Sequence, residues 1–121
     1  MEDQYISFEI AKLAKEKGFD EASPWAFQDD GEEYSGFNWW NKKNGWYSRV
    51  TQSFLAKWLR EKHKITITII PTIGYNRNVD VTRYSFRLFR KGTSITGNST
   101  PKDTYEEAME DGLREALRIV G

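Results

Sequence analysis

Hydrophobic positions between residues 51 and 70 change from a helical to an extended spacing with almost no loop between the two patterns. The helical half places four apolar residues on one side of a helix, at Phe54, Leu55, Trp58 and Leu59. Thr51 stands ahead of them as an N-cap. The extended half is β-branched from Ile65 to Ile70, which favours a strand, and Pro71 then ends that strand or places it at a sheet edge. The pattern predicts a helix packed on the isoleucine face of a sheet.

Two further segments have the spacing of amphipathic helices. The first covers residues 5 to 17, with an apolar stripe at Ile6, Ile10, Leu13 and Ala14 and with Ser7 as its N-cap. Gly18 followed by Phe19 is typical of a glycine-terminated helix whose next apolar residue folds back and is buried. The second begins at Thr104, where a T-x-x-E capping box precedes a long apolar stripe. Gly112 lies on that stripe, which indicates close approach to another backbone.

Aromatic residues are concentrated between residues 25 and 47. Asp30-Gly31 and Asn44-Gly45 in this span are strong hairpin-turn dipeptides. They predict a meander of short strands near residues 24 to 28, 34 to 41 and 45 to 50. Trp39 and Trp40 then point to opposite faces of one strand.

Residues 81 to 91 form the next predicted strand, after a polar loop over residues 72 to 80 that carries Gly74 and Asn76. Alternation along it separates an apolar face from a polar one: Tyr84, Phe86 and Leu88 against Arg83, Ser85 and Arg87. Residues 92 to 102 are rich in Gly, Ser and Thr and predict a loop.

The predicted fold is therefore one α+β domain over residues 1 to 121, with a mainly antiparallel sheet, three helices on one face and the order α-β-β-(β)-α-β-β-α. Its core should unite Trp58, Leu59, Ile67, Phe86, Leu113 and Leu117.

Charge is unevenly distributed although its sum is zero. Residues 42 to 91 carry twelve Lys or Arg and two Asp or Glu. Residues 1 to 41 carry three Lys or Arg and ten Asp or Glu, and residues 92 to 121 carry three Lys or Arg and six Asp or Glu. Two interpretations are compatible with this pattern. Either acidic helices neutralise a basic sheet, or the basic segment forms an anion-binding face.

The sequence contains no cysteine, which excludes disulfides and thiolate sites. The chain shows neither a signal sequence nor a membrane span, which predicts a cytoplasmic protein.

Candidate chemistry is sparse. His63, the single histidine, lies at a predicted helix end, where an imidazole suits the helix dipole. Acidic residues at 29 to 33 do not have the spacing of a calcium loop. The Gly-rich residues 92 to 99 lack the lysine of a phosphate-binding loop. We therefore expect no catalytic residue, metal or cofactor, and no enzyme activity.

Two binding surfaces are predicted instead. The first is aromatic, at Trp39, Trp40, Trp46 and Tyr47, and would bind a host protein or small ligand unless these rings form a second core. The alternative is a basic surface that would bind single-stranded nucleic acid, at Lys57, Arg60, Lys64, Arg83 and Arg87.

Three segments of the chain resemble one group of proteins: SFEIAKLAKEKGFD, TQSFLAKWLREKHKI and TYEEAMEDGLREALRIV. The group consists of small uncharacterised proteins from gut Bacteroidales genomes and from the phages and mobile elements that infect them. This resemblance implies no catalytic or binding residues. It implies a setting, that of a phage or mobile-element accessory protein in a bacterial cytoplasm, of a kind that often binds host factors or small ligands.

Overall fold

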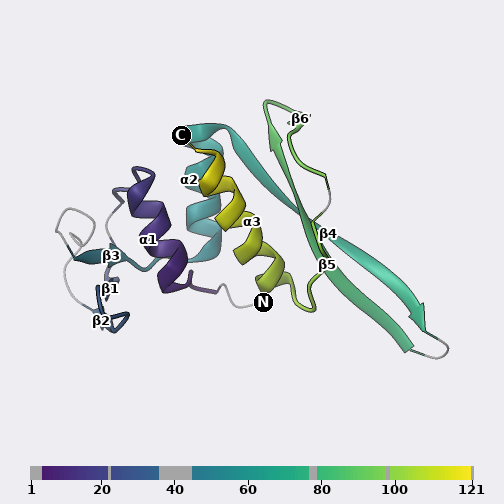
Figure 1. Ribbon diagram of the computed structural model, residues 1–121, viewed down its shortest axis with the longest axis horizontal. Coiled ribbons are helices and arrows are strands. Elements are labelled where there is room, and N and C mark those ends of the chain that lie inside the picture. Colours follow the sequence, from purple (N-terminus) through teal and green to yellow (C-terminus); the bar gives the residue numbers. More distant parts are fainter. Residues whose placement is uncertain (1–3, 22, 36–44, 77–78, 98, 121) are drawn as a thin grey trace.

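The computed structural model describes residues 4–21, 23–35, 45–76, 79–97 and 99–120, with the backbone alone at residues 73–76 and 79–81. Within these ranges the chain forms three helices and two three-stranded antiparallel sheets (Figure 1). In chain order the elements are α1 (Phe8–Glu16), β1 (Trp25–Gln28), β2 (Glu33–Ser35), β3 (Trp46–Ser48), α2 (Gln52–His63), β4 (Ile65–Asn76), β5 (Val79–Arg90), β6 (Thr93–Ser94) and α3 (Tyr105–Ile119). The α+β class and the predicted order of elements are confirmed.

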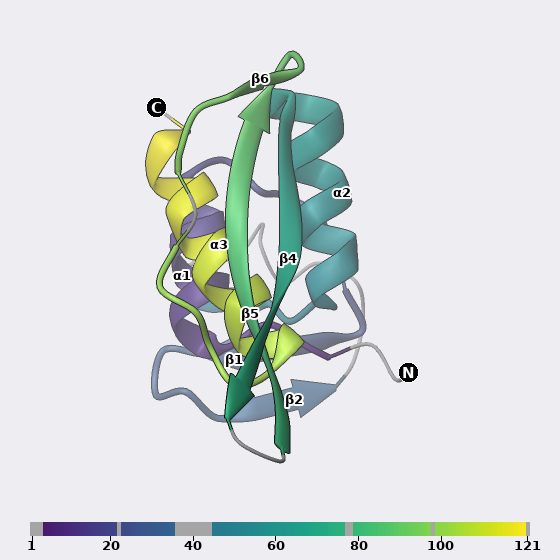
Figure 2. The ribbon, with the colours of Figure 1, turned by 90° about the vertical axis from the view of Figure 1, so that its right-hand side faces the viewer.

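The helices lie between the two sheets (Figure 1). The small sheet has the order β2-β1-β3 and packs against α1, where Phe8 contacts the ring of Phe27 at a centroid distance of 5.5 Å. The large sheet has the order β4-β5-β6, and α2 and α3 pack against one face of its long β4–β5 hairpin (Figure 2). A single sheet with all helices on one face was the wrong arrangement, because the aromatic meander pairs only with itself and covers α1 from the other side.

Local sequence signals place the helix ends. Ser7, Thr51 and Thr104 each accept a hydrogen bond from a backbone N–H in the first turn of the helix that follows. After α1, Gly18 has φ +95° and the N–H of Phe19 donates to the carbonyl of Ala14, as the glycine-terminated pattern predicts. Phe19 is buried, also as predicted. The predicted helix start at residue 5 is wrong, since the Ser7 cap begins the helix at Phe8.

The β4–β5 hairpin is longer than predicted. Continuous antiparallel pairing runs from Ile65 opposite Arg90 to Asn76 opposite Val79, so the predicted loop over residues 72 to 80 is largely strand. Pairing of two strands along their whole length outweighs the local turn preference of Gly74. Pro71 lies inside β4, opposite Tyr84, and β4 is a terminal strand of the sheet. The edge position is therefore the correct one of the two predicted for this proline.

Described side chains of the hairpin alternate between the face that packs on the helices and the opposite face. Ile65, Phe86 and Leu88 are buried against the helices, whereas Thr66 and Thr68 on the opposite face are exposed. The predicted core is confirmed: Trp58, Leu59, Phe86, Leu113 and Leu117 belong to one buried cluster, and Ile67 packs against it.

The segment that follows β5 returns along the outer edge of that strand. Beyond the short β6, the hydroxyls of Thr96 and Ser99 accept hydrogen bonds from the N–H groups of Leu88 (2.9 Å) and Phe86 (2.8 Å). Lys102 exchanges two backbone hydrogen bonds with Tyr84 (2.8 and 2.6 Å). This Ser/Thr-rich segment, predicted as a plain loop, thus supplies hydrogen-bond partners for the outer edge of β5 from Tyr84 to Leu88.

All three helices run in the same direction (Figure 1), and their first turns are joined by hydrogen bonds. The N–H of Ser7 donates to a Glu110 carboxylate oxygen (3.0 Å). The Gln52 side-chain amide donates to the Glu106 carbonyl (3.1 Å) and to the other Glu110 oxygen (3.1 Å). Parallel helices place three positive dipole ends together, which a nearby carboxylate stabilises.

Candidate binding groove

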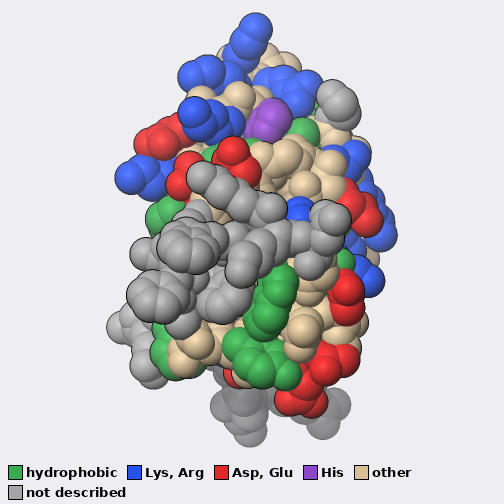
Figure 3. Space-filling model, turned by 90° about the vertical axis from the view of Figure 1, so that its left-hand side faces the viewer, with side chains coloured by type: hydrophobic (Ala, Val, Ile, Leu, Met, Phe, Trp, Pro, Cys, Tyr) green, Lys and Arg blue, Asp and Glu red, His purple; other side chains and the backbone are tan. Residues whose placement is uncertain are grey.

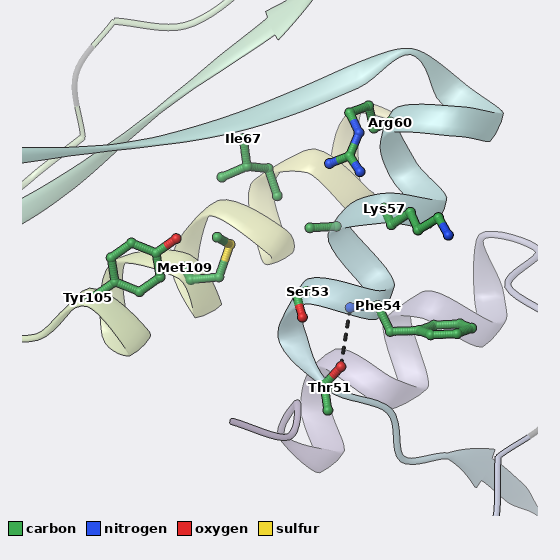
Figure 4. Close-up of a pocket in the computed structure, with 9 residues that line it drawn as sticks. Thr51, Ser53, Phe54, Lys57, Arg60, Ile67, Tyr105 and Met109 are labelled. Atoms are coloured by element: carbon green, nitrogen blue, oxygen red, sulfur yellow. Dashed lines mark hydrogen bonds between the residues drawn. The ribbon is translucent and has the colours of Figure 1, made fainter. Parts of the chain in front are cut away.

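A groove of about 550 Å³ lies between α2, β4 and the start of α3 (Figure 4). Ala56 and Arg60 reach it from α2, one turn apart, Ile67 from β4, and Tyr105 and Met109 from successive turns of α3. Figure 4 shows Arg60, Ile67 and Met109 directed toward the space between the helices and the strand. Three elements therefore contribute to one site.

Apolar side chains form the floor of the groove and aromatic side chains its rim. Met109 is buried and Ile67 is half-buried. Phe54 is 44% exposed and Tyr105 is 38% exposed, which is high for such large rings. Phe54 and Lys57 project toward the other side of α2 (Figure 4), where they also line a smaller groove beside Trp58. Exposed aromatic residues beside an apolar depression are typical of protein-binding sites.

The cations of α2 have no carboxylate partner among the described residues. Ion pairs elsewhere join Arg49 to Glu33 (3.6 Å), Arg83 to Asp103 (3.7 Å), Lys102 to Asp111 (3.4 Å), Arg114 to Glu9 (2.8 Å) and Asp111 (2.7 Å), and Arg118 to Glu115 (3.6 Å). In the described ranges, Lys57, Arg60 and Lys62 take part in none of them. Acidic residues of α1 and α3 therefore neutralise cations of their own neighbourhood and leave those of α2 available.

Arg114 illustrates this local neutralisation. It bridges α1 and α3, and its hydrogen bond lowers the pKa of Glu9 below the usual value for a carboxyl group. Figure 3 shows a related segregation on one face, with Lys and Arg side chains gathered at the upper end and Asp and Glu prominent at the lower right. Basic residues at helix C-termini and acidic residues at helix N-termini account for part of it, because they complement the dipoles of parallel helices.

The predicted aromatic surface is only partly described. Trp39 and Trp40 lie outside the described residues. Trp46 is half-buried, with its ring edge-on to Tyr34 at 5.3 Å. Tyr47 packs edge-on to the Phe8 ring at 5.7 Å and belongs to the contact between the small sheet and α1. Among the described rings of this segment the exposed ones are Trp25 (41%) and Tyr34 (40%).

The predicted basic surface is divided between two faces of the molecule. Lys57 and Arg60 border the groove. Lys64 follows α2 and its ammonium group donates to the Glu61 carbonyl (3.2 Å). Arg83 and Arg87 occupy the register positions that face away from the helices.

The remaining candidates have structural contacts. His63 lies in the last turn of α2, with its ring 4.8 Å from that of Trp58. In the acidic turn, Asp29 accepts a hydrogen bond from the Tyr47 hydroxyl (2.7 Å), which raises the pKa of Tyr47, and Asp30 accepts one from the N–H of Glu32 (2.9 Å). Across the described ranges, no three His, Asp or Glu side chains are grouped so that they could hold a metal ion.

Sequence reasoning assigned Phe54, Tyr105 and Met109 to the apolar stripes of helices and did not identify them as a site. The available signal was the position of Phe54 and Tyr105 in the first turn of their helices. In the first turn of each helix, the apolar stripe extends beyond the elements that cover the later turns, and its side chains therefore remain exposed.

Comparisons with protein-family models, with curated proteins and with solved structures give no match for this chain. Within the described ranges, no helix has the length and apolar character needed to cross a membrane. The groove and its charges are therefore the features on which a proposal about function can rest.

Proposed function

We propose that this is a non-enzymatic binding protein, an accessory protein of a phage or mobile element in a bacterial cytoplasm, that binds an anionic segment of a partner protein in the groove. The observation that carries this proposal is the pair Lys57 and Arg60. Neither has an ion-pair partner among the described residues, and both line an open groove with an apolar floor and an aromatic rim.

The chemistry of the lining favours a protein partner. Apolar area from Ile67 and Met109 supplies the desolvated centre that protein interfaces bury. Exposed Phe54 and Tyr105 supply rings that lose few rotamers on binding. Cations at the side of such a groove attract a partner of opposite charge and increase its association rate.

The lining also favours binding over catalysis. Among the described residues that line the groove, the titratable ones are Lys57, Arg60 and Tyr105, and none is a carboxylate or an imidazole. The Thr51 hydroxyl accepts the hydrogen bond from the N–H of Phe54 that caps α2. A lysine and an arginine without a neighbouring base suit recognition of an anion.

Single-stranded nucleic acid is the second candidate partner. Lys57 and Arg60 lie on α2 and Lys64 directly follows it, and Phe54 and Tyr105 offer faces on which bases could stack. The placement of Arg83 and Arg87 on the opposite sheet face removes two of the cations from such a site.

Fluorescence anisotropy with two labelled polyanions, oligoglutamate and oligo-dT of equal charge, tests the proposal. We expect oligoglutamate to bind at low salt and its affinity to fall by about tenfold or more in Lys57→Glu/Arg60→Glu. The matched control is Lys12→Glu/Lys17→Glu on α1, which changes the charge equally and should bind like the original chain. Equal losses in both double variants, or no binding of oligoglutamate, would contradict the proposal. Stronger binding of oligo-dT with a steep salt dependence would favour nucleic acid.

A further inference from the structure

One edge of the β4–β5 hairpin is open. The inner edge of β5 pairs with β4, and its outer edge from Tyr84 to Arg90 is occupied by β6 and the segment that ends at Lys102. β4 pairs with β5 on one side, and no described strand pairs with its other side. Figure 2 shows that α2 extends past this open edge of β4.

The hydrogen bonds of β5 determine which groups of β4 are available. Tyr84, Phe86 and Leu88 direct their backbone groups away from β4, toward Lys102, Ser99 and Thr96. The β4 residues opposite Phe86 and Leu88 are Ile69 and Ile67. In an antiparallel ladder both members of such a pair turn their backbone groups outward. The N–H and C=O of Ile67 and Ile69 therefore point to the open edge.

The open edge and the groove are adjacent, because Ile67 belongs to both. A strand added beside β4 would lie above the part of α2 that carries Arg60 (Figure 4). Its alternate side chains would point into the groove, about 7 Å apart. One apolar side chain could cover Met109 and Ala56, and an acidic one two positions along could reach Arg60.

Resting on the proposed function, we infer that the partner segment binds in extended form, as an additional strand on the outer edge of β4, with acidic and apolar side chains alternating into the groove. Backbone hydrogen bonds to Ile67 and Ile69 would supply affinity, Arg60 and the apolar floor would select the side chains that enter the groove, and Lys57 would add positive charge at its border. Charge complementarity identifies the occupant as acidic, since Lys57 and Arg60 have no carboxylate partner among the described residues.

A second copy of the chain is a poorer occupant of the same edge. Pro71 has no N–H and occupies another outward-pointing position, opposite Tyr84, which shortens the row of donors available for edge-to-edge pairing. Two β4 strands paired across a two-fold axis would also bring the unpaired cations of both α2 helices together. An acidic strand avoids that repulsion.

Amide hydrogen exchange, followed by NMR, tests the inference with an acetylated peptide of alternating Val and Glu of about strand length. We expect exchange at Ile67 and Ile69 to slow by about tenfold or more when the peptide is bound. The amides of Thr66 and Thr68 are internal controls, because they already face β5 and should change little. A matched peptide, N-methylated on alternate residues, keeps every charge but loses its donors along one edge, and should bind about tenfold more weakly.

Ile69→Pro removes one outward N–H without removing a bond to β5, and Ile69→Ala is its control for the lost side chain. We expect the proline variant to bind the peptide about tenfold more weakly than the alanine variant. Each variant is first checked for an intact fold by its NMR spectrum.

The outcomes separate the inference from the function on which it rests. Binding that needs Lys57 and Arg60 but leaves Ile67 and Ile69 unprotected would overturn strand addition and keep the anionic protein partner. Failure of both the peptide and oligoglutamate to bind would overturn both. A concentration-dependent dimer that Ile69→Pro abolishes would assign the edge to a second copy and overturn the acidic partner, and protection by oligo-dT alone would assign it to nucleic acid.

Discussion

Gly112 of α3 lies so close to Ile67 of β4 that a Cβ atom on the glycine would stand 2.8 Å from the Ile67 Cγ2 atom. Phe86 would be the next neighbour, with ring and Cβ atoms at 3.3 and 3.4 Å. The sequence predicted that this glycine approaches another backbone; the atoms it approaches are instead side-chain atoms of Ile67 and Phe86 in the hairpin. This approach allows α3 to lie close to the hairpin whose open edge borders the groove.

Gly112→Ala should destabilise the protein by roughly 1–3 kcal/mol, because the overpacking against Ile67 outweighs the gain of about 1 kcal/mol in helix propensity. Urea unfolding measures it. Ile67→Ala removes the clashing atom, so its cost should be smaller in the Gly112→Ala background than in the original chain. Gly97→Ala is the control, since a Cβ there meets nothing within 4 Å. A Gly112→Ala variant at least as stable as the original chain would show that the hairpin adjusts freely, since only the gain in helix propensity would then remain.

Sequence signals predicted the features of this fold that depend on neighbours within one turn. The Thr51 cap and the Gly18–Phe19 ending involve contacts between residues at most five positions apart. The length of the hairpin was mispredicted, because Gly74 prefers a turn locally and pairing with β5 decides otherwise. The groove could not be predicted, since Phe54 and Tyr105 come to line one site only after α2 and α3 pack on β4.

Gln52→Glu should destabilise the protein by about 1–3 kcal/mol at neutral pH. The Gln52 amide nitrogen donates to the Glu106 carbonyl and lies 3.1 Å from Glu110, so an ionised carboxylate there loses the donors and repels Glu110. Such repulsion raises the folded-state pKa of the introduced carboxyl group above the unfolded value of about 4.3. The loss of stability should therefore be largest at pH values above the folded-state pKa and shrink as pH falls.

Gln52→Met is the matched control for this pH dependence. It removes the same donors without adding a charge, so its cost should not follow the titration of the new carboxylate. Urea unfolding of both variants at several pH values measures the difference. Parallel pH profiles for the two variants would rule out repulsion with Glu110 as the cause.

Tyr47 should ionise at a higher pH than an ordinary tyrosine, because its hydroxyl donates to Asp29 and tyrosinate beside that carboxylate is disfavoured. A raised folded-state pKa stabilises the fold below the unfolded value of 10.0, and this contribution is lost as pH rises through the folded-state pKa. Asp29→Asn should lower the Tyr47 pKa. Tyrosinate absorbance measures it, with Tyr47→Phe to assign the band. An unchanged titration in Asp29→Asn would show that the hydrogen bond has no such effect.

Lys64→Gly should stabilise the protein by about 0.5–1 kcal/mol. Lys64 follows α2 with φ 60° and ψ 28°, a left-handed conformation that costs a side-chain-bearing residue free energy and a glycine almost none. Lys62→Gly is the matched control, because it removes the same charge two residues earlier, inside the helix, where glycine costs up to about 1 kcal/mol. The two substitutions should therefore move the melting temperature in opposite directions. A decrease in both would mean that the Lys64 side chain, whose ammonium group donates to the Glu61 carbonyl, stabilises the end of α2 by more than its backbone conformation costs.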